Sequence, residues 1–342
     1  MTYTEAFTQA KDKENPGCNE DLIIADQGRL YVVIDGATDK SGRTYDGLTG
    51  GQIAGRILED VLRNTDRGSG QFETVPTSII LDRVNRRLRN RYRALGIADV
   101  IRREPWRRFS AQASIVIERN GVYRFIVIGD TGLRLNGKEV FFNPKPGDII
   151  CARLRVAVHR YLTKSGASDS TADRWSRAYT VEGLRAVLSA GPEVIGTTEL
   201  EDLRNEALEE SRRRLPNLAE KEIDDVLMYG LKGLHRYRNR PGPFGFPVID
   251  GSPVPEDMIV EFERPAESID CIELFSDGYV SIPHRAAVAD WEALYANMER
   301  DDPKRLNAYP ETKGSSAERF ADDRTVLIVR PGMTTERRDE TA

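Results

Sequence analysis

Cysteine and histidine are scarce in this chain, whose 342 residues include three of each. The thiols of Cys18, Cys151 and Cys271 are too few and too scattered for a disulfide framework, and Cys271 falls in an apolar run that suits a small buried thiol. Zinc chemistry is disfavoured, because zinc sites draw mainly on cysteine and histidine. A reducing cytoplasm is therefore the expected compartment.

Long apolar runs are also missing. No stretch reaches about 18 apolar residues, and the N-terminus has no apolar segment of signal-peptide length, so we expect neither a membrane span nor export. The net charge of −5 disfavours nucleic acid as a partner, although residues 83–108 hold ten arginines, which we interpret as a solvated helix face. The usual motifs of nucleotide triphosphatases, zinc proteases and serine hydrolases are absent.

The chain does contain enough apolar sequence for a sizeable core, since 39% of its residues are hydrophobic. Short β-branched and aromatic runs indicate strands, and apolar residues at helical spacing indicate helices. Asn-Gly pairs at 120–121 and 136–137 are strong hairpin signals. The predicted elements of this part are a hairpin over 22–35, helices over 49–63 and 77–95, and an antiparallel meander over 114–118, 122–128, 133–135 and 140–142.

The middle of the chain has a different character, because charged residues surround apolar stripes at helical spacing from about 148 to 236. We interpret residues 151–240, approximately, as a helical insertion. Residues 331–342 are expected to form a mobile polar tail. The predicted elements are helices over 148–162, 181–188, 199–215, 219–237 and 284–299, and strands over 259–262, 271–275 and 325–329.

Acidic residues stand beside several of these strands. Asp35, Asp130 and Asp277 each follow an apolar strand and adjoin a glycine, Asp21 precedes the first hairpin, and Asp322 precedes the last strand. Carboxylates gathered at one edge of a sheet repel one another unless a cation neutralises them, and oxygen-only ligation favours Mg²⁺ or Mn²⁺ over Zn²⁺. The pattern therefore predicts a divalent-metal site.

One Asp-Gly dipeptide is weak evidence, because it is a common turn. We interpret Asp46-Gly47 and Asp250-Gly251 as turns of this kind. The joint order of five acidic signatures beside predicted strands is far more specific than any one of them.

That order resembles the metal-dependent protein phosphatase family, also called protein phosphatase 2C: an acidic pair, Asp-Gly after a strand, Gly-Asp-Thr after a hairpin, Ser-Asp-Gly after a strand and a late Asp-Asp-x-Thr. The resemblance spans residues 19–330 apart from the helical block. It implies an α+β fold, a four-layer α-β-β-α sandwich of two antiparallel sheets flanked by helices. It also implies a catalytic domain over 1–330, interrupted by the helical insertion at about 151–240.

The resemblance assigns roles to single residues and implies two Mn²⁺ or Mg²⁺ ions, with a weaker third position. Asp35 and Asp277 are the implied catalytic residues, and a water that bridges two metals would attack phosphorus. Asp322 is preferred to Asp323 as a ligand. The implied metal-site residues are Asp35 as the bridge, the Gly36 carbonyl, Asp277 and Asp322 on one ion, Asp130 at the third position, and Asp21 with Glu20 supporting the water shell.

Three departures from the family pattern are visible. Ala37 stands where many relatives have a histidine after the first Asp-Gly, so solvent would have to protonate the leaving group. Pro16 stands where many have a phosphate-gripping arginine, and Lys11 and Lys13 are the nearest basic residues. Residues 110–114 replace a turn of small residues, a change that we assign to packing more than to catalysis.

These observations leave three functions to compare. The preferred one is a metal-dependent phosphatase for phosphoserine and phosphothreonine in proteins, with a phosphorylated protein as partner. A pseudophosphatase that acts as a regulatory binding module is the second, motivated by Ala37 and Pro16. The third is a phosphatase for a small phosphorylated metabolite, with the insertion as a lid. The choice between Mg²⁺ and Mn²⁺ and the oligomeric state stay open.

Overall fold

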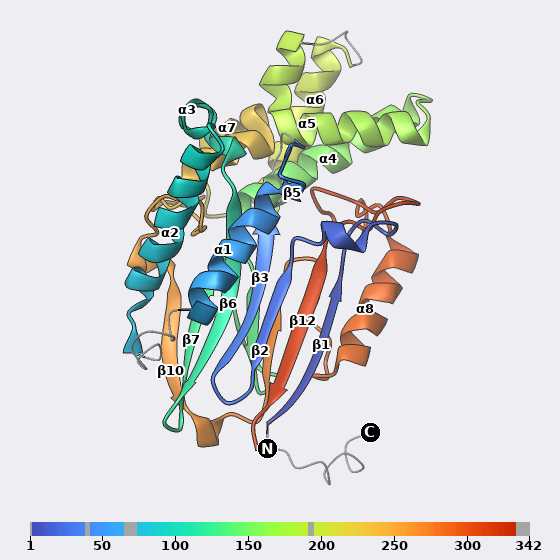
Figure 1. Ribbon diagram of the computed structural model, residues 1–342. Helices are drawn as coiled ribbons and strands as arrows, with labels where there is room; N and C mark the ends of the chain where they lie inside the picture. The colour runs from blue at the N-terminus through green and yellow to red at the C-terminus, as the bar shows by residue number, and fades with distance from the viewer. Residues whose placement is uncertain (1, 38–41, 65–73, 191–194, 333–342) are drawn as a thin grey trace. The chain divides into compact units, whose positions relative to one another are not determined.

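The structure is a computed structural model that describes residues 2–37, 42–64, 74–190 and 195–332 (Figure 1). The chain divides into two compact units, one formed by Met1–Pro144, Phe246–Asn297 and Glu318–Ala342, and the other by Lys145–Gly245 and Met298–Ala317. Of the predicted tail at 331–342, residues 333–342 lie outside the described residues. No helix among the described residues is both long and apolar enough to cross a membrane.

The first unit contains two five-stranded antiparallel sheets. One has the order β1 (Tyr3–Gln9), β12 (Arg324–Arg330), β11 (Ile272–Phe275), β8 (Gly132–Leu135), β9 (Glu139–Phe141). The other has the order β10 (Val260–Pro265), β7 (Val122–Ile128), β6 (Ser110–Arg119), β3 (Leu30–Ala37), β2 (Leu22–Asp26). A short hairpin joins β4 (Thr44–Tyr45) to β5 (Leu48–Thr49).

The two sheets pack face to face because their central strands are apolar on both sides. In β3, Tyr31 and Val33 belong to the core that also holds Leu274 and Leu327 of the other sheet, whereas Val32 points the opposite way. A strand buried on both faces has no polar alternation, which is why this one appears in the sequence as a continuous apolar run.

Helices cover the outer faces of the sandwich. On one side, α1 (Gly50–Asn64) and α2 (Thr77–Ala94) share an apolar core with β3 and β6. On the other side, α8 (Val288–Asp301) places the Trp291 ring 4.8 Å from that of Phe275, which lies on the outer face of β11. The predicted four-layer α-β-β-α fold is confirmed (Figure 1). Shorter helical elements are α3 (Ala98–Arg103) and 3-10 turns at Pro16–Cys18, Pro105–Arg107, Leu234–Tyr237, Glu256–Met258 and Ala266–Ser268.

Both hairpins of the predicted meander are confirmed, but its single sheet is wrong. β6 and β7 pair around Asn120-Gly121, and β8 and β9 pair around Asn136-Gly137, but β8 pairs with β11 in the other sheet. The chain therefore changes sheets between Ile128 and Gly132. Gly129 has a φ of +87°, a conformation that favours glycine, and it allows the abrupt change of direction. This crossing carries Asp130.

The second unit is helical, with α4 (Pro146–Lys164), α5 (Asp169–Ala190), α6 (Thr197–Arg214) and α7 (Glu220–Gly233). The four helices predicted for this block are found, although α5 begins at Asp169 and not at the predicted 181, and α4 packs against the other three. Gly183 in α5 and Gly230 in α7 both have positive φ and interrupt their helices. A Cβ on Gly183 would lie 2.5 Å from the Gly230 nitrogen, so only glycine allows this close backbone contact.

Candidate metal centre

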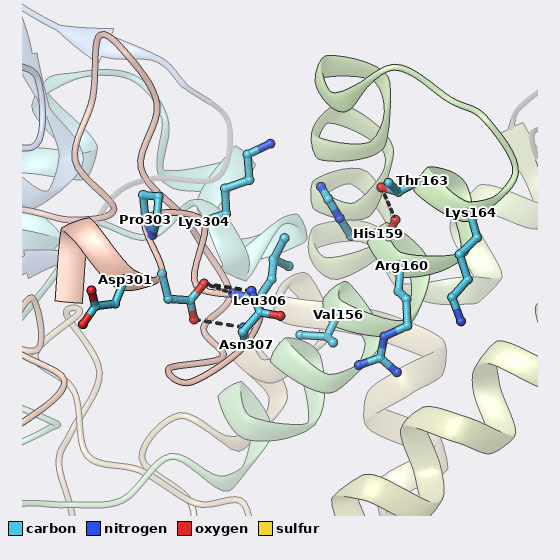
Figure 2. Close-up of a pocket in the computed structure, with 11 residues that line it drawn as sticks. Val156, His159, Arg160, Thr163, Lys164, Asp301, Pro303, Lys304, Leu306 and Asn307 are labelled. Carbon is cyan, nitrogen blue, oxygen red and sulfur yellow. Dashed lines mark hydrogen bonds between the residues drawn. The ribbon is translucent and has the colours of Figure 1, made fainter.

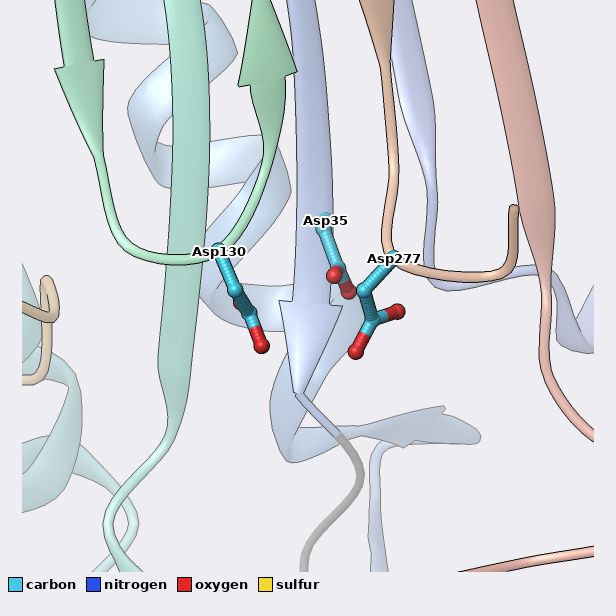
Figure 3. Close-up of side chains that lie close together, drawn as sticks. All are labelled: Asp35, Asp130 and Asp277. Atoms are coloured by element: carbon cyan, nitrogen blue, oxygen red, sulfur yellow. The ribbon is translucent and has the colours of Figure 1, made fainter. Parts of the chain in front are cut away.

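Three carboxylates meet at one edge of the sandwich unit. Asp35 comes from the end of β3, Asp130 from the crossing between β7 and β8, and Asp277 from the segment after β11. One carboxylate oxygen of each lies within 4.8 Å of the other two. Figure 3 shows the three side chains extending in the same direction from three separate elements. Distant parts of the sequence are thus brought together by the antiparallel pairing of the strands.

Asp35 is the buried member of this group, and Asp277 is the exposed one. Burial, followed by the charges of Asp277, Asp21, Asp130 and Asp322, raises the pKa of Asp35 well above its usual range. A buried carboxylate facing four others gains most from a cation, because a cation removes both the desolvation cost and the repulsion.

The Asp130 backbone is held by β6. The side-chain oxygen of Gln112, which lies opposite Asp35 in the β3–β6 ladder, accepts a 3.0 Å hydrogen bond from the Asp130 N–H. The Ser114 and Thr131 hydroxyls, both buried, lie 3.1 Å apart. Residues 110–114 were assigned to packing from the sequence, and Gln112 was not recognised as part of the site. Its signal was present, since an amide side chain in an apolar strand needs a partner.

Asp277 follows a serine that ties three segments together. The buried Ser276 hydroxyl donates a 2.7 Å hydrogen bond to the Asp21 carboxylate and accepts one from the Thr325 N–H at 2.9 Å. Asp21 is therefore held beside the ends of β11 and β12. Burial and the charge of Asp323 raise the pKa of Asp21 well above its usual range. Gly278 is required next to Asp277, because a Cβ there would lie 2.0 Å from the Asp323 carbonyl oxygen.

Lys11, one of the two basic residues nearest to Pro16, faces carboxylates in the structure. Its ammonium lies 2.5 Å from the Glu20 carboxylate, 2.7 Å from Asp323 and 3.9 Å from Asp322. Burial lowers the pKa of Lys11, but the charges of Asp322, Glu20 and Asp323 outweigh it and raise the pKa above the ordinary value. Lys11 is thus buried among carboxylates. Of the two neighbouring acids, Asp323 is buried against Lys11, whereas the Asp322 side chain is 22% exposed.

Gly36 lies where the sandwich meets α1. A Cβ on Gly36 would lie 2.7 Å from the Glu20 carbonyl oxygen and 2.8 Å from the Gly51 backbone. The Thr49 hydroxyl, just before α1, donates a 2.5 Å hydrogen bond to the Glu20 carboxylate. Close backbone packing therefore explains the glycine after Asp35 whether or not its carbonyl holds a metal.

The two remaining Asp-Gly pairs differ from those at this edge. Asp46 and Gly47 have φ of +52° and +79° and form the β4–β5 turn, as predicted. Asp250 is buried and accepts a 3.0 Å hydrogen bond from the Ser252 N–H, and Gly251 has a φ of +93°. The dipeptide alone does not separate turn from site, but its position relative to the strand ends does.

The donor set fits Mg²⁺ or Mn²⁺. Both ions prefer hard oxygen ligands, and carboxylates of this kind converge here around the buried Asp35. We call the five residues that surround this point, Asp21, Asp35, Asp130, Asp277 and Asp322, the acidic edge. Hard cations held by carboxylates are suited to phosphate chemistry.

Solved structures that resemble this chain are those of bacterial phosphatases. A bacterial serine phosphatase matches 96% of this chain and 98% of its own, with a TM-score of 0.46 and 11% identity. The serine/threonine phosphatase Stp1 from Staphylococcus aureus covers 96% and 95%, with a TM-score of 0.44 and 11% identity. The PstP catalytic domain in complex with two manganese ions covers 96% and 97%, with a TM-score of 0.40 and 13% identity.

No protein-family model matches the sequence, and no curated protein matches it either. Identities of 10–14% are too low to transfer an activity, so function has to be argued from the chain's own residues.

Proposed function

We propose that this chain is a metal-dependent phosphatase that hydrolyses phosphoserine and phosphothreonine in proteins. The observation that carries the proposal is the convergence of Asp35, Asp130 and Asp277 from three separate elements, with ligand oxygens within 4.8 Å of one another. The order of these residues along the chain supports the same reading, because it resembles the order in the metal-dependent protein phosphatases.

The residues of the acidic edge would hold two Mn²⁺ or Mg²⁺ ions, with Asp130 at a third position. When bound, such ions neutralise phosphate oxygens and activate water at neutral pH. The protein's own contribution is to fix the ligands: Ser276 orients Asp21, and Gln112 holds the backbone at Asp130. Ligands fixed in this way need little rearrangement during the reaction.

The leaving group receives its proton from solvent in this proposal. Ala37 has no ionisable side chain, and it directly follows the Asp35-Gly36 pair. The alkoxide of a departing serine or threonine is basic enough to be protonated by water. Lys11 does not grip phosphate here, because Glu20 and Asp323 engage its ammonium.

A second candidate is a binding module without catalysis, and Lys11 is the observation that favours it. An ammonium 3.9 Å from Asp322 already supplies positive charge next to a proposed ligand. If Lys11 takes the place of a cation at Asp322, the edge would bind fewer ions and serve recognition instead of hydrolysis. This candidate predicts a folded chain without turnover.

The deciding experiment measures hydrolysis of p-nitrophenyl phosphate and of a phosphothreonine peptide with Mn²⁺, with Mg²⁺ and with chelator. The variants are Asp35→Asn and Asp277→Asn. Asp46→Asn is the matched control, because Asp46 is an exposed Asp-Gly turn residue whose positive φ suits asparagine. We expect metal-dependent turnover in the parent and the control and at least about a 100-fold loss in the two site variants.

Two results would contradict this proposal. A folded parent that binds metal but hydrolyses neither substrate would favour the binding module. Turnover of p-nitrophenyl phosphate with none of the phosphopeptide would replace the protein substrate with a small phosphate ester.

A further inference from the structure

The helical unit contains a pocket that is lined by arginines. Its volume is about 400 Å³, and its walls come from α4, α5 and residues 314–316. Three arginines line it, Arg155, Arg174 and Arg177, together with one acidic residue, Asp173. We call this site the arginine pocket.

None of these three arginines forms an ion pair within the described part of the chain. Arg155 is 1% exposed and donates to the backbone carbonyls of Arg305 at 3.2 Å and Glu311 at 3.0 Å, and its Nε has no hydrogen-bond partner there. Arg177 donates to the Gly314 carbonyl at 3.0 Å. These carbonyls satisfy N–H groups but do not neutralise the charge.

Arg174 is exposed and contacts a ring instead of a carboxylate. Its guanidinium lies 5.5 Å from the centre of the Trp175 ring. Most other arginines in this unit are paired, for example Arg160 with Glu206 at 2.7 Å. What distinguishes the pocket is that three arginines without an ion pair among the described residues line one cavity.

The one carboxylate in the pocket faces another cation. Asp173 lies 3.3 Å from the Lys304 ammonium and 3.2 Å from His159 Nε2. Burial lowers the pKa of His159 below its ordinary value, so Lys304 is the cation of this group. A single carboxylate that already faces Lys304 cannot neutralise three guanidinium charges.

A second cavity in the same unit has a different arrangement. Its volume is about 440 Å³, and Figure 2 shows it between α4 and residues 301–307, with His159 and Lys304 on its wall. Here Arg160 pairs with Glu206, and Lys304 with two aspartates. Basic residues line both cavities, but two of those in the second cavity are paired with carboxylates, whereas none of the three arginines of the arginine pocket forms an ion pair among the described residues.

Electrostatics add to the geometric argument. Burial, followed by the charge of Arg177, lowers the pKa of Arg155 to about 10, although the charges of Asp173, Asp302 and Glu311 act in the opposite direction. Placing a buried cation near a second cation is unfavourable unless an anion compensates. Guanidinium groups bind phosphate oxygens through paired N–H donors, so a site with several of them suits a phosphate better than a carboxylate or a halide.

We propose that the arginine pocket binds a phosphate-class anion, supplied either as inorganic phosphate or as the phosphoryl group of a phosphorylated peptide. The site is separate from the acidic edge in its residues. It does not rest on the phosphatase proposal, because anion binding here needs no metal and no turnover.

The test is isothermal titration calorimetry of the full chain in chelator, with inorganic phosphate, a phosphothreonine peptide and its unphosphorylated twin as probes. Chelator leaves the acidic edge without added cations, so that edge repels anions and does not mask the pocket. We expect phosphate or the phosphopeptide to bind, and the unphosphorylated twin not to bind. Equal affinity for both phosphorylated probes would assign the site to free phosphate, and tighter peptide binding would assign it to a phosphoprotein.

Arg174→Gln and Arg177→Gln are the informative variants, because both side chains are exposed. Each should weaken binding about tenfold or more, the usual effect of losing a charge-assisted hydrogen bond. Arg213→Gln is the matched control: it removes the same charge from an exposed position on α6, outside the pocket. If the Arg155→Met variant folds, it extends the series and should also weaken binding. If it does not fold, Arg174→Gln and Arg177→Gln alone test the proposal.

Two outcomes would overturn the proposal: no binding of either phosphorylated probe at millimolar concentration, or equal affinity of parent, Arg174→Gln and Arg177→Gln. The phosphatase proposal fails separately, through loss of metal-dependent turnover. Binding in chelator by a chain without turnover would leave the arginine pocket intact and refute the catalytic role of the acidic edge.

Discussion

The acidic edge and the arginine pocket are both sites of one charge sign, but they differ in how much opposite charge the chain itself provides. At the acidic edge, a buried lysine, Lys11, lies among Glu20, Asp322 and Asp323. In the arginine pocket, the single carboxylate, that of Asp173, contacts His159 and Lys304 and forms no ion pair with the three arginines. An excess of one sign that the fold keeps in place indicates a ligand of the other sign.

The difference also concerns the origin of the residues. The acidic edge collects residues from strand ends that are far apart in the sequence, so its geometry depends on sheet pairing. Arg174 and Arg177 are three positions apart on α5, so they share a helix face by local geometry alone.

The largest expected effect separates Asp322, a member of the acidic edge, from its neighbour Asp323, which pairs with Lys11. Asp322→Asn should lower kcat for p-nitrophenyl phosphate by about 10²–10³-fold, because it removes a proposed ligand. Asp323→Asn should retain activity within about threefold. Asparagine keeps a side-chain oxygen that can accept the hydrogen bond from the backbone N–H of Lys11. Steady-state kinetics with Mn²⁺ compares the two. Equal losses would mean that both residues belong to the ligand set.

A substitution of Lys11 tests how much of the negative charge near the acidic edge is already neutralised by the chain itself. Lys11→Met leaves the buried carboxylates of Glu20 and Asp323 without their cation, and should lower the free energy of unfolding by about 3 kcal/mol. Urea unfolding in chelator measures this. Lys13→Met is the control, because Lys13 is exposed, with its ammonium 4.7 Å from the centre of the Phe320 ring. A similar small change in both variants would show that Lys11 is not a compensating charge.

A substitution of Asp35 tests how much the excess negative charge lowers the stability of the folded chain when no metal is added. Its pKa is raised in the folded chain, so its contribution to stability is present below the unfolded pKa and is lost as pH rises through the folded pKa. Asp35→Asn stays neutral at every pH. In chelator near pH 7 the variant should therefore be more stable than the parent, and this advantage should disappear towards pH 4.

Added Mn²⁺ should reverse that order, because it stabilises the parent and not the variant. Thermal unfolding in chelator and in Mn²⁺ checks both statements, with Asp46→Asn as the control that should follow the parent. A parent that is more stable than Asp35→Asn in chelator would mean that Asp35 is already neutralised by the protein.

Much of the fold could be predicted from local signals. Asn120-Gly121 marked the β6–β7 hairpin, and the apolar run of β3 marked a strand buried on both faces. The edge strand β1 was not predicted, because Tyr3–Gln9 is only half-buried and lacks a continuous apolar run. The change of sheet at Gly129 was not predicted either, since a glycine signals flexibility but not which sheet the next strand joins.

Part of the acidic edge could also be predicted from local signals in the sequence. Asp35 and Asp277 could be proposed because each follows a strand, and strand ends have a known place in a sheet. The contacts of Lys11 and Gln112 depend on neighbours that are distant in sequence, and no local pattern reports them. The arginine pocket was missed because Arg155, Arg174 and Arg177 look like ordinary charged helix positions until the absence of partners is seen.

The smallest expected effect concerns Gln112, which distinguishes a site positioned by its sheet from one positioned by its ligands alone. Gln112→Ala removes the acceptor of the Asp130 N–H and should weaken Mn²⁺ binding about tenfold, the usual effect of losing an outer contact of a metal ligand. Ser114→Ala is the matched control: it removes a buried hydroxyl that contacts Thr131, the residue directly after Asp130.

Titration calorimetry with Mn²⁺ compares the affinities, and urea unfolding in chelator separates them from stability. Both variants should lose similar stability, because each leaves one buried polar group without its partner. Only Gln112→Ala should lose metal affinity. If Ser114→Ala weakens Mn²⁺ binding as much, general loosening of the sheet crossing accounts for the effect, and Gln112 has no special role in placing Asp130.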